Sequence, residues 1–208
     1  METAAHPRSL FKPRTFGKIL VTLTSSASLR TGVVKTFRCV TSVLPNATPY
    51  DLGCQPSPSV PAETVIADGW CTYLLFLAVS QDLDSNGKLT DMGVAVLRCD
   101  NCVSSRFGYP NDEGFAEHPL YELCRGITSP AIQIDGSDWL RSTRDQMRGS
   151  TKRIWGDQYK PTTTVLSHFL LPLKEATFEC IAESLTVECY CDSYDAAFAH
   201  VKQRLAEN

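Results

Sequence analysis

The sequence predicts an α+β fold with a mainly antiparallel sheet built from hairpins, one internal helix and a C-terminal helix. Short runs rich in β-branched and aromatic residues outnumber the segments with helical spacing. These runs follow one another along the chain, separated by turn residues, which favours antiparallel pairing. A length of 208 residues fits one domain. We expect strands and a proline-rich connection in residues 1–95 and the candidate functional site in residues 96–208.

The N-terminal part begins with two predicted strands. Residues 17–24 and 32–44 are rich in β-branched side chains and read as a hairpin-like unit. Residues 45–63 contain five prolines, which excludes a helix or a central strand and predicts a connection ordered against the surface. Two further apolar runs, residues 70–80 and 90–99, are expected to be strands.

The segment DLDSNGKLTDMG, residues 82–93, joins these last two strands and fits two patterns. Its residues Asp82, Asp84 and Asn86 match the first half of an EF-hand loop, but its twelfth position is Gly93 instead of a bidentate glutamate. Its flanks also read as strands. Asn-Gly between alternating runs is a strong hairpin signal, because both central residues of such a turn adopt positive φ. We therefore predict a hairpin and not a calcium loop.

The C-terminal half is expected to contain a short strand and two helices. Residues 131–135, AIQID, read as the strand. Ser137 is a suitable N-cap for the internal helix, and Gly149 is expected to end it. Ser193 is expected to cap the C-terminal helix, whose apolar residues recur at helical spacing.

A second hairpin is predicted between the two helices. Residues 165–173 and 177–182 are apolar runs close enough for a tight turn at Lys174-Glu175-Ala176. Because Pro172 cannot donate a backbone hydrogen bond, the first of these strands is expected to be an edge strand or to carry a bulge. Alternation places His168 on the opposite face from Phe169.

Charge is unevenly distributed along the chain. Residues 1–50 carry seven Lys/Arg against one acid, and residues 51–135 carry twelve acids against four Lys/Arg. The basic segment fits an organelle transit peptide less well than it fits strands, and its scattered charges lack a nucleic-acid-binding motif. Nothing approaches 18 consecutive apolar residues. We expect no nucleic-acid partner and no membrane span, and leave the oligomeric state open.

Nine cysteines without a secretory signal predict free cysteines in a reducing, cytoplasmic setting. The pairs Cys99/Cys102 and Cys189/Cys191 could together bind zinc, although C-x-C is a poorer half-site than C-x-x-C. Separate thiols are the expected outcome, and the sequence requires no cofactor. A catalytic pairing of a cysteine with a histidine, for instance Cys124 with His118, is chemically possible but easily arises by chance.

The segment FGYPNDEGFAEHPLYE, residues 107–122, concentrates acids and a histidine where prolines and glycines prevent regular structure. If this loop folds over the hairpin of residues 165–182, its polar residues meet those of the hairpin. The candidate catalytic residues are then His118, Asp112, Glu113, His168 and Glu175. The candidate substrate-binding residues are Asn111, Tyr109 and Lys174. The alternative is an ordinary solvated loop in which Asn111 and Asp112 cap a turn.

Residues 98–183 also resemble a bacterial protein family of unassigned function. The resemblance lies in FGYPNDE, HPL, SDWL and HFLLPLKEATFECIA, which are similar to the family's FGxPNDE, HPL, a small-residue–Trp segment and HFxFxFHDSTFECIA. It marks the same loop and hairpin that the chemistry selects. The family's His-Asp-Ser at the turn is Lys174-Glu175-Ala176 here, which puts any chemistry of that histidine in doubt.

Two functions are therefore expected from the sequence. The first is an enzyme that acts on a small polar molecule by acid/base chemistry, with His118 transferring the proton and Asp112 or Glu113 orienting it. The same histidines and carboxylates offer a metal-assisted variant. The second is a non-catalytic binding or inhibitor protein of the immunity type, whose acidic surface docks a basic protein partner.

Overall fold

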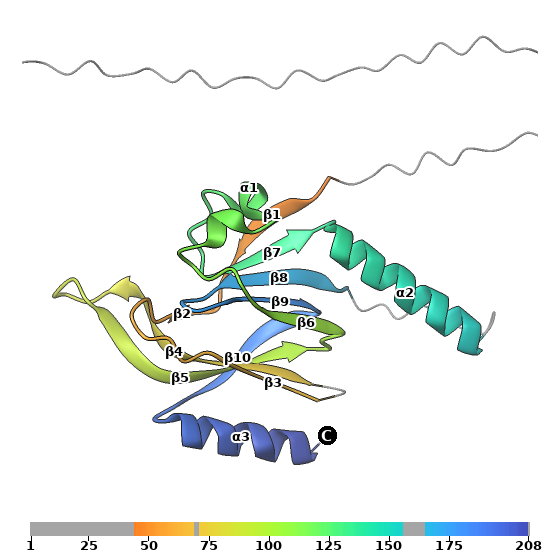
Figure 1. Cartoon of the computed structure of the whole chain (residues 1–208). Coiled ribbons are helices and arrows are strands. Elements are labelled where there is room, and N and C mark those ends of the chain that lie inside the picture. The colour runs from red at the N-terminus through yellow and green to blue at the C-terminus, as the bar shows by residue number, and fades with distance from the viewer. Residues whose placement is uncertain (1–43, 69–70, 156–164, 208) are drawn as a thin grey trace, which may run out of the picture. The chain divides into compact units, whose positions relative to one another are not determined.

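Two antiparallel sheets form the frame of the protein (Figure 1). The computed structural model describes residues 44–68, 71–155 and 165–207. The first sheet contains, in spatial order, β1 (Asn46–Tyr50), β7 (Ala131–Asp135), β8 (Ser167–Pro172), β9 (Thr177–Ala182) and β6 (Ser104–Gly108). The second sheet contains β10 (Ser184–Cys191), β5 (Leu89–Asp100), β4 (Thr72–Leu83) and, alongside β4, the short strands β2 (Gln55–Pro56) and β3 (Thr64–Ala67).

The sheets pack face to face over one apolar core. Strand alternation sends every second side chain of each sheet into this core, which holds Phe76 and Leu97 of the second sheet against Phe169 and Phe178 of the first. Tyr50 packs edge-on against Phe169, at 4.9 Å between the ring centroids. The burial of these aromatic side chains is the main stabilising contribution at this interface.

Helix α3 (Tyr194–Glu207) lies along the outer face of the second sheet, and most of α2 (Asp138–Trp155) projects away from the first sheet (Figure 1). Helix α3 packs Ala197 and Val201 against the second sheet. On the first sheet lie the 3₁₀ turn η1 (Phe115–Glu117), the short helix α1 (Tyr121–Cys124) and the first turn of α2. No helix of the described residues is long and apolar enough to cross a membrane.

The predicted fold class is confirmed, as are the main hairpins and both serine caps. Strands β4 and β5 pair as a hairpin, and so do β8 and β9. Ser137 and Ser193 accept the capping hydrogen bonds of α2 and α3. The connection of residues 45–63 contributes only strands at sheet edges, β1 and β2. The strands expected at residues 17–24 and 32–44 lie, apart from Leu44, outside the described residues. The prediction of one domain over the whole chain therefore stays a prediction.

Three local predictions are wrong. The β4–β5 turn is longer than an Asn-Gly turn: of the central pair only Gly87 has positive φ, and the Asp84 carboxylate accepts the backbone N–H of Asn86 and Lys88. Strand β8 is a central strand, because it lies between β7 and β9. It tolerates Pro172 because its pairing with β7 ends at Leu170, so the proline lies beyond that ladder. Helix α2 continues through Gly149, since a glycine inside a helix costs only about 1 kcal/mol.

Candidate functional site

A buried carboxylate, Glu179 of β9, lies on the outer face of the first sheet. Alternation along β9 points Phe178 and Cys180 into the core and Glu179 outward. The same alternation along β8 points His168 outward, diagonally across from Glu179. His168 Nε2 lies 2.9 Å from Glu179 Oε2, and the two residues are 1% and 8% exposed. The carboxylate and imidazole therefore form a hydrogen-bonded pair away from water.

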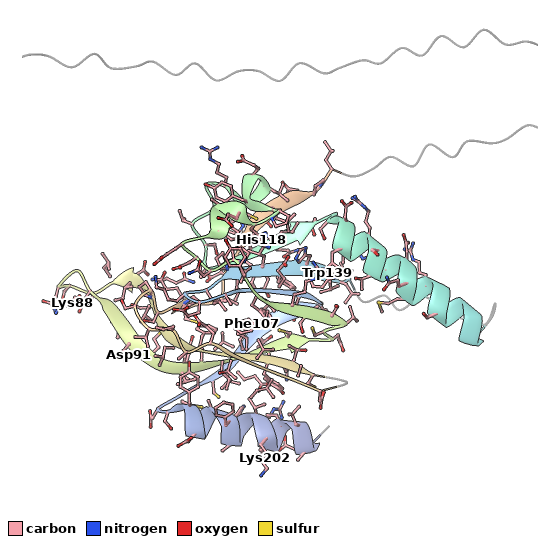
Figure 2. All side chains as sticks on the ribbon, in the orientation of Figure 1. Lys88, Asp91, Phe107, His118, Trp139 and Lys202 are labelled. Carbon is pink, nitrogen blue, oxygen red and sulfur yellow. The ribbon has the colours of Figure 1, made fainter. Side chains whose placement is uncertain are left out.

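The segment between β6 and α1 carries His118, which is labelled in Figure 2, and brings this second imidazole to the carboxylate. The segment is fixed to the β8–β9 hairpin by two hydrogen bonds, from Thr177 Oγ1 to the Pro110 carbonyl and from the Asp112 N–H to the Leu173 carbonyl. The ring of His118 stacks on Phe115 and places Nε2 3.5 Å from Glu179 Oε1. Glu179 thus lies between two histidines that are 50 residues apart in the sequence.

Hydrogen-bond partners determine which ring nitrogens carry protons. Glu179 as a carboxylate only accepts, so His168 donates from Nε2, and its Nδ1 accepts the O–H of Ser137 at 3.0 Å. Ser137 Oγ in turn accepts the Leu140 N–H as the N-cap of α2. The Leu120 N–H donates to Nδ1 of His118 at 3.2 Å, which leaves the proton of a neutral His118 on Nε2, facing Glu179. His168 therefore donates to the Glu179 carboxylate, and the Nε2–H of His118 faces the same anion at 3.5 Å.

This arrangement keeps Glu179 ionised although it is buried. Burial alone would raise the pKa of the carboxyl group, but hydrogen bonds from His118 and His168 outweigh it and lower the pKa from 4.5 to about 2. A carboxylate with so low a pKa is a weak base. Such a carboxylate can orient and polarise the imidazoles and can accept a hydrogen bond from a donor group in the pocket.

We expect Ser137→Ala to destabilise the protein by about 2 kcal/mol, against about 1 kcal/mol for Ser193→Ala. Both serines cap a helix with similar geometry, at 3.1 and 3.2 Å from the capped N–H. Only Ser137 is also hydrogen-bonded to a buried histidine, whose Nδ1 loses its donor in the variant. Urea denaturation of both variants measures the difference, and equal losses would show that the Ser137–His168 bond contributes nothing.

Glu179, His118 and His168 together form a polar centre, and this centre opens into a pocket of about 620 Å³. Its floor contains His118, His168, Glu179 and Ser137, and its rim includes Tyr109, Trp139 and Arg106. The edge of the Trp139 ring contacts the His168 ring at 5.0 Å between the centroids. A pocket of this size and mixed lining suits a small polar ligand.

The structure brings together only part of the predicted site. His118, His168 and Tyr109 line the pocket, whereas the other predicted residues do not, namely Asn111, Asp112, Glu113, Lys174 and Glu175. The Tyr109 hydroxyl donates to Glu117. Asn111 Oδ1 accepts the Gly114 N–H and thereby shapes the loop. The expectation that Glu175 faces His118 is not met, because Glu175 is exposed at the hairpin turn.

Asp112 and Glu113 have a different partner from the one predicted. Lys174 Nζ lies 2.6 Å from Glu113 Oε1 and 3.7 Å from Asp112 Oδ1. The Lys174 N–H also donates to Glu63 at 2.9 Å. These residues hold the loop against the hairpin, and the carboxylate that contacts His118 is Glu179 instead of Asp112 or Glu113.

Sequence reasoning missed Glu179, Arg106 and Trp139 as site residues and recognised Ser137 only as a cap. The sequence did contain a pointer to Glu179, because this residue belongs to TFECIA, one of the segments on which the expected family resemblance rests. In addition, the alternation of side chains along the two strands, continued across their three-residue turn, puts Glu179 on the same face as His168. Arg106 reaches the site only through the pairing of β6 with β9, which its sequence does not reveal.

The cysteine pairs considered for zinc do not meet. Cys99 lies in the core between the sheets, whereas Cys189 and Cys191 pack under α3 on the opposite face of the second sheet. The last two lie on one face, with 3.7 Å between their sulfur atoms. Across the described ranges, no group of three or more His, Cys, Asp or Glu residues is placed to hold a metal ion.

A cysteine–histidine nucleophile also lacks support in the geometry. Cys124, the last residue of α1, is buried, and burial raises the pKa of its thiol to about 11. Cys180 points into the core on the other side of the sheet from His168. Neither thiol is therefore available as a thiolate to the pocket.

Comparison of the chain with known protein families, with curated proteins and with solved structures finds no match.

Proposed function

We propose that the chain is an enzyme that acts on a small polar molecule by general acid/base chemistry in the pocket over the first sheet. The observation that carries the proposal is the buried Glu179 carboxylate between two imidazoles at the floor of a pocket. Buried ionised groups in a cleft are uncommon and mark functional sites more often than other positions.

In this proposal the two histidines have different roles. His118 is the proton-transfer residue, because its 3.5 Å contact with Glu179 is longer than a good hydrogen bond and leaves Nε2 able to turn to a ligand. His168 is a positioning residue, because hydrogen bonds of 3.0 and 2.9 Å occupy both its ring nitrogens. Glu179 orients the imidazole of His118. A neutral His118 takes a proton at Nδ1, which requires the 3.2 Å hydrogen bond from the Leu120 N–H to open, and Glu179 stabilises the cation that forms.

The test compares His118→Gln with His200→Gln. Pools of small polar metabolites are incubated with each protein in D₂O and followed by mass spectrometry, which detects deuterium uptake as well as bond hydrolysis. We expect the wild type to change at least one compound and His118→Gln to do so at least ~100-fold more slowly. His200 also pairs with a glutamate, Glu188, at 3.0 Å, but lies outside the pocket, so its variant should behave as the wild type.

Two outcomes would contradict the proposal. One is that the wild type changes no compound in any pool. The other is that His118→Gln changes the same compounds at the wild-type rate while remaining folded by circular dichroism. The non-catalytic alternative, a binding or inhibitor protein with an acidic docking surface, predicts the first outcome together with salt-sensitive binding to a basic protein.

A further inference from the structure

Arg106 is the cation nearest in the sheet to the buried carboxylate. It lies on β6 directly opposite Glu179 of β9, so the two side chains share the outer face of the first sheet. The Arg106 Cζ atom lies 3.9 Å from the centroid of the Trp139 ring. Trp139 in turn contacts His168. Arg106 is therefore held beside the polar centre by a ring that also packs on that centre.

The stacking leaves the hydrogen-bonding edge of the guanidinium available. Cation–π contact uses the flat face of the group, whereas its five N–H donors lie in the plane of the group. In the part of the chain that the structure describes, no ion pair joins Arg106 to a carboxylate. Arg141 also lines this pocket, but its guanidinium forms an ion pair with Asp138. A planar, bidentate donor of this kind matches a carboxylate or a phosphate.

Glu179 restricts which anion fits. Directly opposite residues of an antiparallel pair have their Cβ atoms only about 5 Å apart, so a ligand held by Arg106 extends its remaining groups toward Glu179. A second negative charge there would be repelled by the carboxylate, whereas an amine or hydroxyl would donate to it. A phosphate dianion is therefore a poorer match than a carboxylate monoanion.

We propose that the pocket binds a small carboxylate that carries an amine or hydroxyl group a few bonds away, with Arg106 on the carboxylate and Glu179 on the donor group. The inference rests on the proposed function in assigning this class of molecule as the substrate. The binding itself is independent of catalysis. Trp139 positions Arg106, and the donor group of the ligand lies where His118 can exchange a proton with it.

The test is ligand-observed NMR with four pools of compounds. They contain amino- and hydroxy-carboxylates, carboxylates without a donor, hydroxylated phosphate monoesters, and amines without an anion. We expect the first pool to bind the wild type, the carboxylates without a donor to bind at least tenfold more weakly, and Arg106→Gln to lose at least tenfold in affinity. Comparing amines with hydroxyls within the first pool identifies the donor. Arg125→Gln removes an equal charge from an arginine paired with Glu122 outside the pocket and should bind as the wild type.

Three results would overturn the inference. They are no binding of the first pool to the wild type at about 10 mM, equal binding by wild type and Arg106→Gln, or tighter binding of the phosphate pool. Arg106 is exposed, so its replacement leaves the fold intact. If carboxylates bind through Arg106 but no compound is converted in D₂O, the proposed function fails and this inference stands. If only compounds without an anion are converted, this inference fails and the proposed function stands.

Discussion

Glu179→Gln should lower the free energy of unfolding by about 3 kcal/mol at pH 7, and the loss should vanish as the pH falls toward 2. The carboxyl pKa is about 2 in the folded protein, below its ordinary value of 4.5. In acid the unfolded chain therefore takes up the proton first. The stabilisation by Glu179 is complete above about pH 5 and is lost as the pH falls through 4.5 toward 2.

The geometry of the two histidines explains why glutamine is a poor substitute. Each oxygen of Glu179 faces one imidazole: Oε2 accepts from His168, and Oε1 lies 3.5 Å from Nε2 of His118. A glutamine side chain offers one oxygen and one NH₂ group. Its NH₂ would face an N–H donor, so one histidine must change its tautomer or lose its partner. The variant keeps the shape of the side chain but loses both the charge and an acceptor.

Urea denaturation between pH 2.5 and pH 7 measures the effect, with Glu175→Gln as the control. Glu175 lies four residues earlier, is exposed at the β8–β9 turn and loses the same charge on substitution. We expect its stability to follow that of the wild type at every pH. If the curves of Glu179→Gln and the wild type ran parallel over this range, Glu179 would not titrate with a lowered pKa.

Much of the fold was predictable because local patterns and long-range pairing agree. Strands β4 and β5 are long, apolar and joined by a turn containing Asn86 and Gly87, so their pairing is set within one hairpin. Strands β1, β2, β3, β6 and β10 were not predicted. The first four have only two to five residues, and polar residues interrupt β10, which has a pairing irregularity between Val187 and Cys189. Such strands are stabilised by the neighbours they pair with more than by their own composition.

The site was predictable only as far as it is local. His118 and His168 were found because imidazole is chemically distinctive, and the loop does fold over the β8–β9 hairpin. The orienting carboxylate was sought among the neighbours of His118 in sequence, Asp112 and Glu113, which instead contact Lys174. The carboxylate that contacts both imidazoles, Glu179, is positioned by the register of the β8–β9 hairpin. Alternation across this short turn places it on the face of His168, whereas a search among the sequence neighbours of His118 does not reach it.

The family resemblance expected from the sequence stays a prediction. Its pattern has His-Asp-Ser where this chain has Lys174-Glu175-Ala176. None of these three residues lines the pocket. The resembling segments FGYPNDE, HPL and TFECIA, in contrast, contribute Tyr109, His118 and Glu179 to it. The proposed chemistry therefore does not depend on the turn at which the two patterns differ.

His168→Ala should lower the free energy of unfolding by about 4 kcal/mol, clearly more than His118→Ala, for which we expect about 1–2 kcal/mol. His168 is 1% exposed and hydrogen-bonded at both ring nitrogens. Its removal leaves the Glu179 charge without its closer partner, leaves the Ser137 hydroxyl without an acceptor and opens a cavity beside Trp139. His118 has a longer contact with Glu179 and lies at the pocket, where water can replace it.

A double-mutant cycle with Glu179→Gln separates the charge from the packing. If His168 stabilises the fold mainly by hydrogen-bonding an anion, His168→Ala should cost at least 1 kcal/mol less once Glu179 is glutamine. Urea denaturation at pH 7 of both single variants and the double variant gives this coupling energy. Strict additivity would mean that His168 acts through packing alone, and equal losses for the two histidines would remove the basis for assigning them different roles. The same cycle with His118→Ala in place of His168→Ala should give a smaller coupling energy with Glu179. A large coupling for His168 and a small one for His118 is what we expect if His168 is a rigid positioning residue and His118 the proton-transfer residue.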